Sequence, residues 1–246
     1  MRRHARRASV SLGSEVPSRT LMAAAPDTAT APRQAETAAP ADLRAMLMQE
    51  EGARGADIAR HLDALDPDEK LRQVLAVKGK WVKALYDAAA GNPPATLDEF
   101  VPPSSKGTTL IYEGRNSLAM FTRFQKRFLR TESGVIVGYN HQTMMWFTGP
   151  GYFVFQAADG KPPVPDEPYI DYITEPHEIP EGWPAYKPND SGMSKAVYWN
   201  MHDYMRRVAD GVYVGKAYRL AEDIGPAEDI GAYFSLTLQP PGHAKQ

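Results

Sequence analysis

Apolar residues between positions 41 and 91 recur every three or four residues, which is the spacing of one face of an α-helix. A pattern typical of a helix start occurs at residues 66–69: Asp66 can cap the helix, Pro67 takes the first helical position, and Glu69 stands three residues after the cap. Gly79 predicts a break, and Gly91, soon followed by two prolines, predicts the last helix end. We therefore expect a helical segment over residues 41–91.

From about residue 107 the pattern changes to short β-branched and aromatic runs between turns rich in Gly, which is typical of strands. The runs expected to form strands are 108–112, 135–137, 146–147, 152–155 and 169–173. We predict a loop over most of residues 158–192, because this stretch holds eight prolines.

An internal repeat is the most informative feature of the chain. Residues 117–141 align with residues 194–218 at a constant offset of 77 without a gap, and seven of the 25 pairs are identical. After a four-residue insertion, Gly151-Tyr152-Phe153 matches Ala232-Tyr233-Phe234. The match predicts repeat unit 1 over 107–157 and repeat unit 2 over 168–239, with a chance match as the alternative.

Each repeat unit is expected to contain a helix, a Gly turn and aromatic strands. The apolar spacing within 201–208 favours a helix in the second unit, whereas 117–130 in the first unit also fits the alternation of a strand. The expected fold class is α+β: N-terminal helices, then a duplicated helix-plus-antiparallel-strand unit that forms a curled sheet or a partly open barrel.

Residues 1–40 lack any periodic apolar pattern and hold ten Ala, six Arg and three acidic residues. Such a segment buries too little apolar surface to offset the entropy of ordering. We expect a disordered tail over 1–40, for which Met22 is an alternative start, and a single α+β domain over 41–246.

Composition narrows the function classes. The formal net charge of −2 gives no support for nucleic-acid binding. The absence of cysteine excludes disulfides, thiolate metal sites and a cysteine nucleophile, and it fits a cytoplasmic location. No apolar run approaches the roughly 18 residues of a membrane-spanning helix. The six histidines are scattered and no cofactor motif occurs, so we expect neither a metal nor a cofactor.

Two resemblances add to this picture. The stretch NSLAMFTRFQKRF, followed by VGYN and FTGPGYF, resembles a bacterial protein family of unassigned function, chiefly over residues 62–156. This likeness implies no activity or catalytic residue. The second unit, with DYMRRVADGVYVGKAYR and then AYFSLTL, is similar in rhythm to lipocalin-like domains, which implies a barrel with an interior cavity.

Two histidines are candidates for acid–base chemistry. His141 ends a predicted strand, where a solvated turn is the alternative. His202 lies on the predicted helix and shares a face with Tyr198 and Arg206, and the adjacent Asp203 is a further acid–base candidate; a purely polar helix face is the alternative.

A basic stripe is expected on the first-unit helix, where it would either bind an anion or form a solvated face. Its residues are Arg123, Lys126, Arg127 and Arg130.

Aromatic residues of the strands either fill the core or line a cavity. The residues selected as ligand-binding candidates are Tyr139, Trp146, Tyr152, Tyr198, Tyr213 and Arg127. The favoured function is binding of a small apolar or amphipathic molecule in a cavity between the two repeat units. The alternatives are an enzyme with a His acid–base and an Arg-held anionic substrate, and a structural or partner-binding protein without a pocket.

Overall fold

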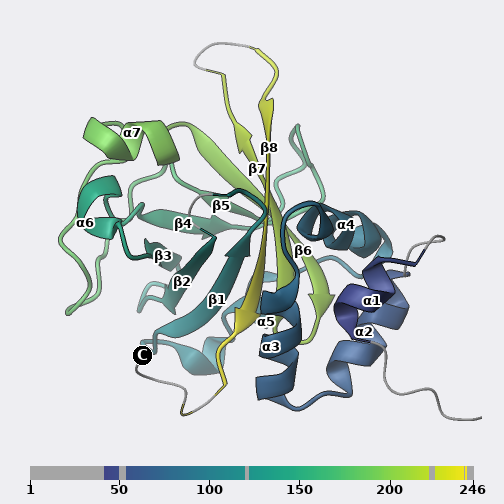
Figure 1. Cartoon of the computed structure of the whole chain (residues 1–246). Helices are drawn as coiled ribbons and strands as arrows, with labels where there is room; N and C mark the ends of the chain where they lie inside the picture. Colours follow the sequence, from purple (N-terminus) through teal and green to yellow (C-terminus); the bar gives the residue numbers. More distant parts are fainter. Residues whose placement is uncertain (1–41, 50–53, 120–121, 222–224, 241, 243–246) are drawn as a thin grey trace, which may run out of the picture. The chain divides into compact units, whose positions relative to one another are not determined.

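Eight antiparallel strands follow one another in chain order around a closed barrel (Figure 1). The ring closes where β1 pairs with β8, with Gly114 opposite Leu236. The strands are β1 (Leu110–Asn116), β2 (Arg123–Arg130), β3 (Ile136–His141), β4 (Phe153–Gln156), β5 (Tyr169–Asp171), β6 (Met201–Ala209), β7 (Val212–Arg219) and β8 (Glu228–Leu238). The expected α+β class with a curled antiparallel sheet is therefore confirmed.

The computed structural model describes residues 42–49, 54–119, 122–221, 225–240 and 242. All of them belong to one unit, Ala39–Gln246. The tail predicted over 1–40 lies outside the described residues. No helix within the described ranges has the length and apolarity that would let it cross a bilayer.

Within the segment predicted to be helical, the described residues form α1 (Leu43–Leu47), α2 (Gly55–Asp63), α3 (Pro67–Ala76) and α4 (Lys80–Ala88). The Asp66 carboxylate accepts a hydrogen bond from the Glu69 amide at 2.9 Å, which is the predicted cap of α3. The predicted break falls at Gly79, which precedes α4 with a φ of 55° that favours glycine. Short 3-10 turns cover Ala89–Gly91 (η1) and Pro103–Ser105 (η2).

These helices cover the outer face of β6, β7 and β8 (Figure 1). Apolar side chains of α1 to α4, among them Leu62 and Leu85, share a core with outward residues of the strands, among them Val208, Val214 and Tyr233. This part of the barrel wall is therefore buried on both faces, with the helices outside and the barrel interior inside.

A short helix, α5 (Leu97–Phe100), closes one end of the barrel interior. Phe100 is fully buried, and its ring centroid lies 4.0 to 4.9 Å from those of four interior aromatic residues: Tyr112, Phe128, Phe155 and Tyr213. Two arginines hold this helix. Arg130 of β2 contacts Asp98 at 2.7 Å, and Arg207 of β6 approaches Glu99 at 3.7 Å.

Gly138 and Gly215 each leave room for an aromatic ring of a neighbouring strand, as Gly114 does for Phe124. A Cβ on Gly138 would come within 2.3 Å of the Phe153 ring, and a Cβ on Gly215 within 2.3 Å of the Phe234 ring. In each case the glycine and the phenylalanine face each other across paired strands. Only glycine leaves room for the ring at these positions.

The helices predicted over 117–130 and 201–208 are wrong where the structure describes these residues, because both stretches lie mainly in strands. For the first unit, the alternative interpretation as a strand, which the alternation of apolar residues also allowed, is correct over β2. In β6, Met201 and Met205 point into the barrel and Val208 packs beneath the helices. A strand buried on both faces loses its alternation and imitates helical spacing. The helix of the second unit is shorter, α7 (Gly192–Tyr198).

The strand predicted over 146–147 is also wrong. These residues lie in a short helix, α6 (Met145–Thr148), and Trp146 is 75% exposed. An aromatic pair alone does not define a strand, because strand preference depends on cross-strand neighbours that this segment lacks.

Candidate functional site

The barrel interior is open at the end opposite α5 and forms a cavity of about 280 Å³. Apolar side chains from both sequence halves line its wall, among them Phe124, Met201, Ala217 and Phe234. Residues 196–198 of α7 lie at the same cavity. The cavity therefore lies between the two predicted repeat units.

Four polar residues form a buried cluster that borders this cavity, which we call the polar cluster: Lys126 of β2, Asn140 of β3, Tyr172 after β5 and Asp203 of β6. The Lys126 Nζ donates to Asn140 Oδ1 at 2.8 Å, to Asp203 Oδ2 at 3.1 Å and to the Tyr172 hydroxyl. The Tyr172 hydroxyl in turn donates to Asp203 Oδ2 at 3.2 Å. An ammonium group has three protons, so each proton of Lys126 has an acceptor.

The ion pair of this cluster is removed from water. The side chains of Lys126 and Asp203 are 3% and 6% exposed. Four aromatic rings surround the Lys126 Nζ, with centroids 5.1 to 5.7 Å away: Phe124, Phe153, Tyr172 and Phe234. Ring faces attract a cation, and this attraction strengthens when water is excluded.

Burial sets the direction of the pKa values in the cluster. It lowers the pKa of Lys126 from its ordinary value, while Asp203 acts in the opposite direction. Burial and the nearby Asp203 raise the pKa of Tyr172 well above its ordinary value. Tyr172 therefore stays a neutral hydroxyl at physiological pH and can donate a hydrogen bond.

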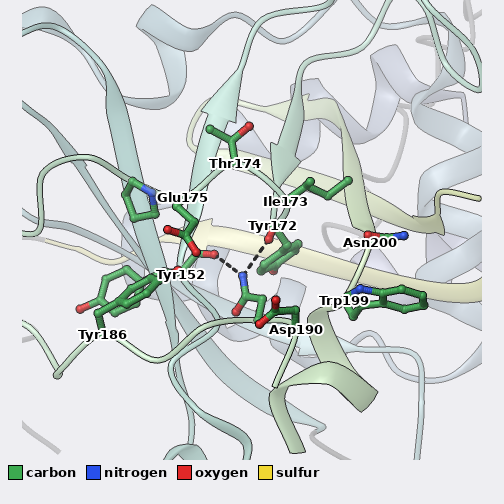
Figure 2. Close-up of a pocket in the computed structure, with 11 residues that line it drawn as sticks. Tyr152, Tyr172, Ile173, Thr174, Glu175, Tyr186, Asp190, Trp199 and Asn200 are labelled. Atoms are coloured by element: carbon green, nitrogen blue, oxygen red, sulfur yellow. Dashed lines mark hydrogen bonds between the residues drawn. The ribbon is translucent and has the colours of Figure 1, made fainter. Parts of the chain in front are cut away.

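The loop before α7 supports Tyr172 from outside the barrel. Asn189 Nδ2 donates to the carbonyls of Tyr152 and Tyr172, both at 2.8 Å, as the dashed lines in Figure 2 show. A second pocket of about 210 Å³ lies here, and Tyr172, Tyr186, Asp190 and Trp199 are among the residues that line it (Figure 2). Its charged lining residues, Glu175 and Asp190, are both exposed, so this pocket has no buried charge comparable to Lys126.

The predicted basic stripe does not form, because its residues lie on a strand. Lys126 and Arg130 point inward, whereas Arg123 and Arg127 point outward. Arg130 donates to the Val101 carbonyl near α5, and it does not reach the cavity.

The outward candidates of the first unit gather on the barrel exterior. Arg127 donates to the Tyr139 hydroxyl at 3.2 Å, and the Tyr139 ring lies 5.8 Å from Tyr152 and 4.8 Å from Trp183. His141 adjoins this group, and burial together with Arg127 lowers its pKa. These residues form an exterior contact between the sheet and the loop.

His202 and Asp203 point to opposite faces of β6. His202 Nε2 lies 3.3 Å from Asp171 Oδ1 on the outer face, and its ring stacks on Tyr169 at 4.5 Å. Burial opposes ionisation of Asp171, but hydrogen bonds from His202 and from residues 173–174 lower its pKa to about 2. The structure therefore does not join His202 with Asp203 or with His141 in one cleft.

Of the remaining aromatic candidates, only Tyr198 reaches the cavity. Its ring stacks on Tyr172 with centroids 5.3 Å apart. Tyr213 packs against Phe100 at the closed end, and Trp146 is exposed on α6. No group of metal-binding side chains occurs among the residues that the structure describes.

The sequence alone points to Asp203 as a neighbour of His202 and to Lys126 as part of a basic stripe, and it does not single out Asn140 or Tyr172. One signal was available. Lys126 and Asp203 are 77 residues apart, the offset of the repeat, so opposite charges stand at matched positions.

The arrangement can hold a molecule whose polar end reaches a buried cation, a carboxylate and a neutral hydroxyl, with apolar walls around the remainder. Comparison of the chain with family models, with curated proteins and with solved structures gives no match, so the likeness over residues 62–156 stays a prediction.

Proposed function

We propose that the protein binds a small, mostly apolar molecule with one polar end inside the open half of the barrel. The observation that carries this proposal is the cavity itself, with apolar walls and the buried Lys126–Asp203 pair at its edge. Binding sites for small molecules typically combine apolar walls with a few placed polar groups.

The size of the cavity limits the ligand. Its volume of about 280 Å³ is close to the lower end of ligand pockets, which span roughly 300–1,000 Å³. The closed end is filled by Phe100 and its aromatic neighbours, so the ligand occupies only the half near α7. We expect a compact ligand with a polar group that hydrogen-bonds to Tyr172 or to the ion pair.

The barrel type supports the proposal. Eight-stranded up-and-down barrels include the lipocalins, whose interior holds one small ligand. The likeness is one of architecture, and it concerns strand number and order only.

We also infer that the two halves of the barrel derive from one repeated unit. Three pairs of residues at the repeat offset have matched surroundings. Gly138 and Gly215 each face a phenylalanine, Arg130 and Arg207 each contact an acid of α5, and Lys126 meets Asp203. Both halves contribute residues to the wall of the cavity between them, so a small molecule bound there would contact both.

A variant that fills the cavity tests the binding proposal. Ala217 is buried on the cavity wall, so Ala217→Phe should place a ring where the ligand would lie. Native mass spectrometry of protein purified from its own host should show a bound small molecule for the original chain and none for the variant.

The matched control is Val135→Phe, because Val135 is exposed in the β2–β3 turn at the closed end. This control should keep the ligand. Absence of any bound molecule from the original chain, together with no uptake of cinnamyl alcohol as an apolar probe in calorimetry, would exclude the proposed function.

A further inference from the structure

We propose that Lys126 forms a reversible imine with an aldehyde bound in the barrel cavity. The proposal deepens the proposed function, because it names the polar end of the ligand as a carbonyl group. It rests on the position of Lys126, the only lysine among the described residues that borders this cavity.

A ligand gains access to Lys126 through the barrel cavity. The Lys126 side chain is almost fully enclosed by protein, yet it lines the same cavity as the apolar wall residues. A ligand that enters from the α7 end therefore meets Nζ with its leading atoms. Surface lysines lack such walls and cannot hold a carbonyl compound in place.

The reaction requires Lys126 to give up a proton. An amine attacks a carbonyl only in its neutral form, and burial favours that form of a lysine. Asp203 Oδ2 lies 3.1 Å from Nζ and can accept the proton that Lys126 gives up. Exchange of this proton inside the pair leaves a neutral amine beside a neutral carboxylic acid.

The Nζ lone pair attacks the carbonyl carbon, and the carbonyl π electrons move to oxygen, which takes the proton held by Asp203. The nitrogen, now positively charged, returns one proton to the Asp203 carboxylate, which leaves a neutral carbinolamine. Asp203 then donates a proton to the carbinolamine hydroxyl, water leaves, and the C=N bond forms. Aldehyde, neutral amine and the Asp203 proton give protonated imine and water, so atoms, protons and electrons balance without an oxidant or a reductant.

Neighbouring groups fit the polar atoms of this reaction. The neutral Tyr172 hydroxyl bonds to both Nζ and Asp203, so it can donate to the carbonyl oxygen during attack. The ring faces around Nζ favour a cation, which suits the protonated imine, and Asp203 supplies its counter-ion.

The test uses the full chain, cinnamaldehyde as the probe and sodium borohydride to trap the imine. Peptide mapping by mass spectrometry should locate one reduced adduct on Lys126 at probe concentrations that leave surface lysines such as Lys83 unmodified. Lys126→Arg keeps the cation but is no amine nucleophile of this kind, so it should abolish this adduct. Asp203→Asn should slow labelling at least tenfold.

Cinnamyl alcohol separates this proposal from the proposed function, because it has the same apolar part but no carbonyl group. If the alcohol binds and Lys126 remains unlabelled, the imine is excluded and simple binding stands. If labelling is spread over surface lysines and spares Lys126, the imine is again excluded. If neither compound binds, both proposals fail.

Discussion

The buried pair of Lys126 and Asp203 gives the sharpest prediction for stability. Removing one partner of a buried ion pair typically lowers stability by about 3–5 kcal/mol, because the other charge stays buried without compensation. In Lys126→Met, Asp203 would keep only the Tyr172 hydroxyl at 3.2 Å, so we expect a loss near the upper end, about 4–5 kcal/mol. In Asp203→Asn, Lys126 would keep Asn140 and Tyr172 as acceptors, so we expect about 3 kcal/mol.

The double variant distinguishes charge compensation from packing. Replacing both partners by apolar residues, as in Lys126→Met with Asp203→Leu, removes both buried charges together. Such replacements are often neutral or stabilising, so we expect a loss of less than about 1 kcal/mol. Urea unfolding followed by far-ultraviolet circular dichroism measures all three values on one scale.

Two further measurements complete this test. The exposed pair of Lys83 and Asp87, 2.6 Å apart, is the control, and breaking it should cost about 0.5 kcal/mol or less. In Asp203→Asn, burial lowers the pKa of Lys126 below that of an unfolded lysine, so the unfolded state binds more protons and stability should rise with pH. Single and double variants with additive losses would refute the charge-compensation reasoning.

Three other predictions concern the frame of the barrel. Phe100→Ala should destabilise the protein by about 3–5 kcal/mol, measured by urea unfolding, because it empties a fully enclosed aromatic site. Gly138→Ala should lower the melting temperature more than Gly215→Ala, because its Cβ would meet the Arg127 carbonyl oxygen at 2.5 Å as well as a ring. Because the pKa of Asp171 is lowered to about 2, its ionised carboxylate should contribute up to roughly 2 kcal/mol to the free energy of unfolding above about pH 4. This contribution should be lost as the pH falls to about 2, which unfolding measurements across this pH range can follow.

Each of these three predictions has a matched control. Phe147→Ala removes a half-exposed ring on α6 and should change stability little. Gly91→Ala adds a Cβ with no atom within 4 Å and should be tolerated. Asp171→Asn should flatten the stability curve between pH 4 and 2, and an unchanged curve would contradict the role given to this carboxylate.

The sequence predicted the helical segment well because its signals are local. Asp66, Pro67 and Gly79 act on their own neighbours in the chain, so their effect can be read without knowledge of the fold. The placement of Phe100 could not be predicted in this way, since it depends on four strands that come together only in the closed barrel.

The candidate site was predicted only in part, and the reason is the direction of side chains. A helix would put Lys126 beside Arg123 and Arg130, whereas a strand puts Lys126 inside the barrel and Arg123 outside. Asp203 was selected with His202 as a neighbour, but successive residues of a strand point to opposite faces. Reading the two repeats as strands would have paired Lys126 with Asp203.

The opposite signs of the charges at these matched positions restrict how half-barrels can associate. If the two halves derive from one unit, as proposed, a pair of β1–β4 halves would bring two lysines together in one interior, and a pair of β5–β8 halves would bring two aspartates together. Like charges brought together in the interior repel, so we expect unlike halves to form the more stable pair. When the two halves are expressed as separate fragments, they should therefore assemble with each other and not with themselves.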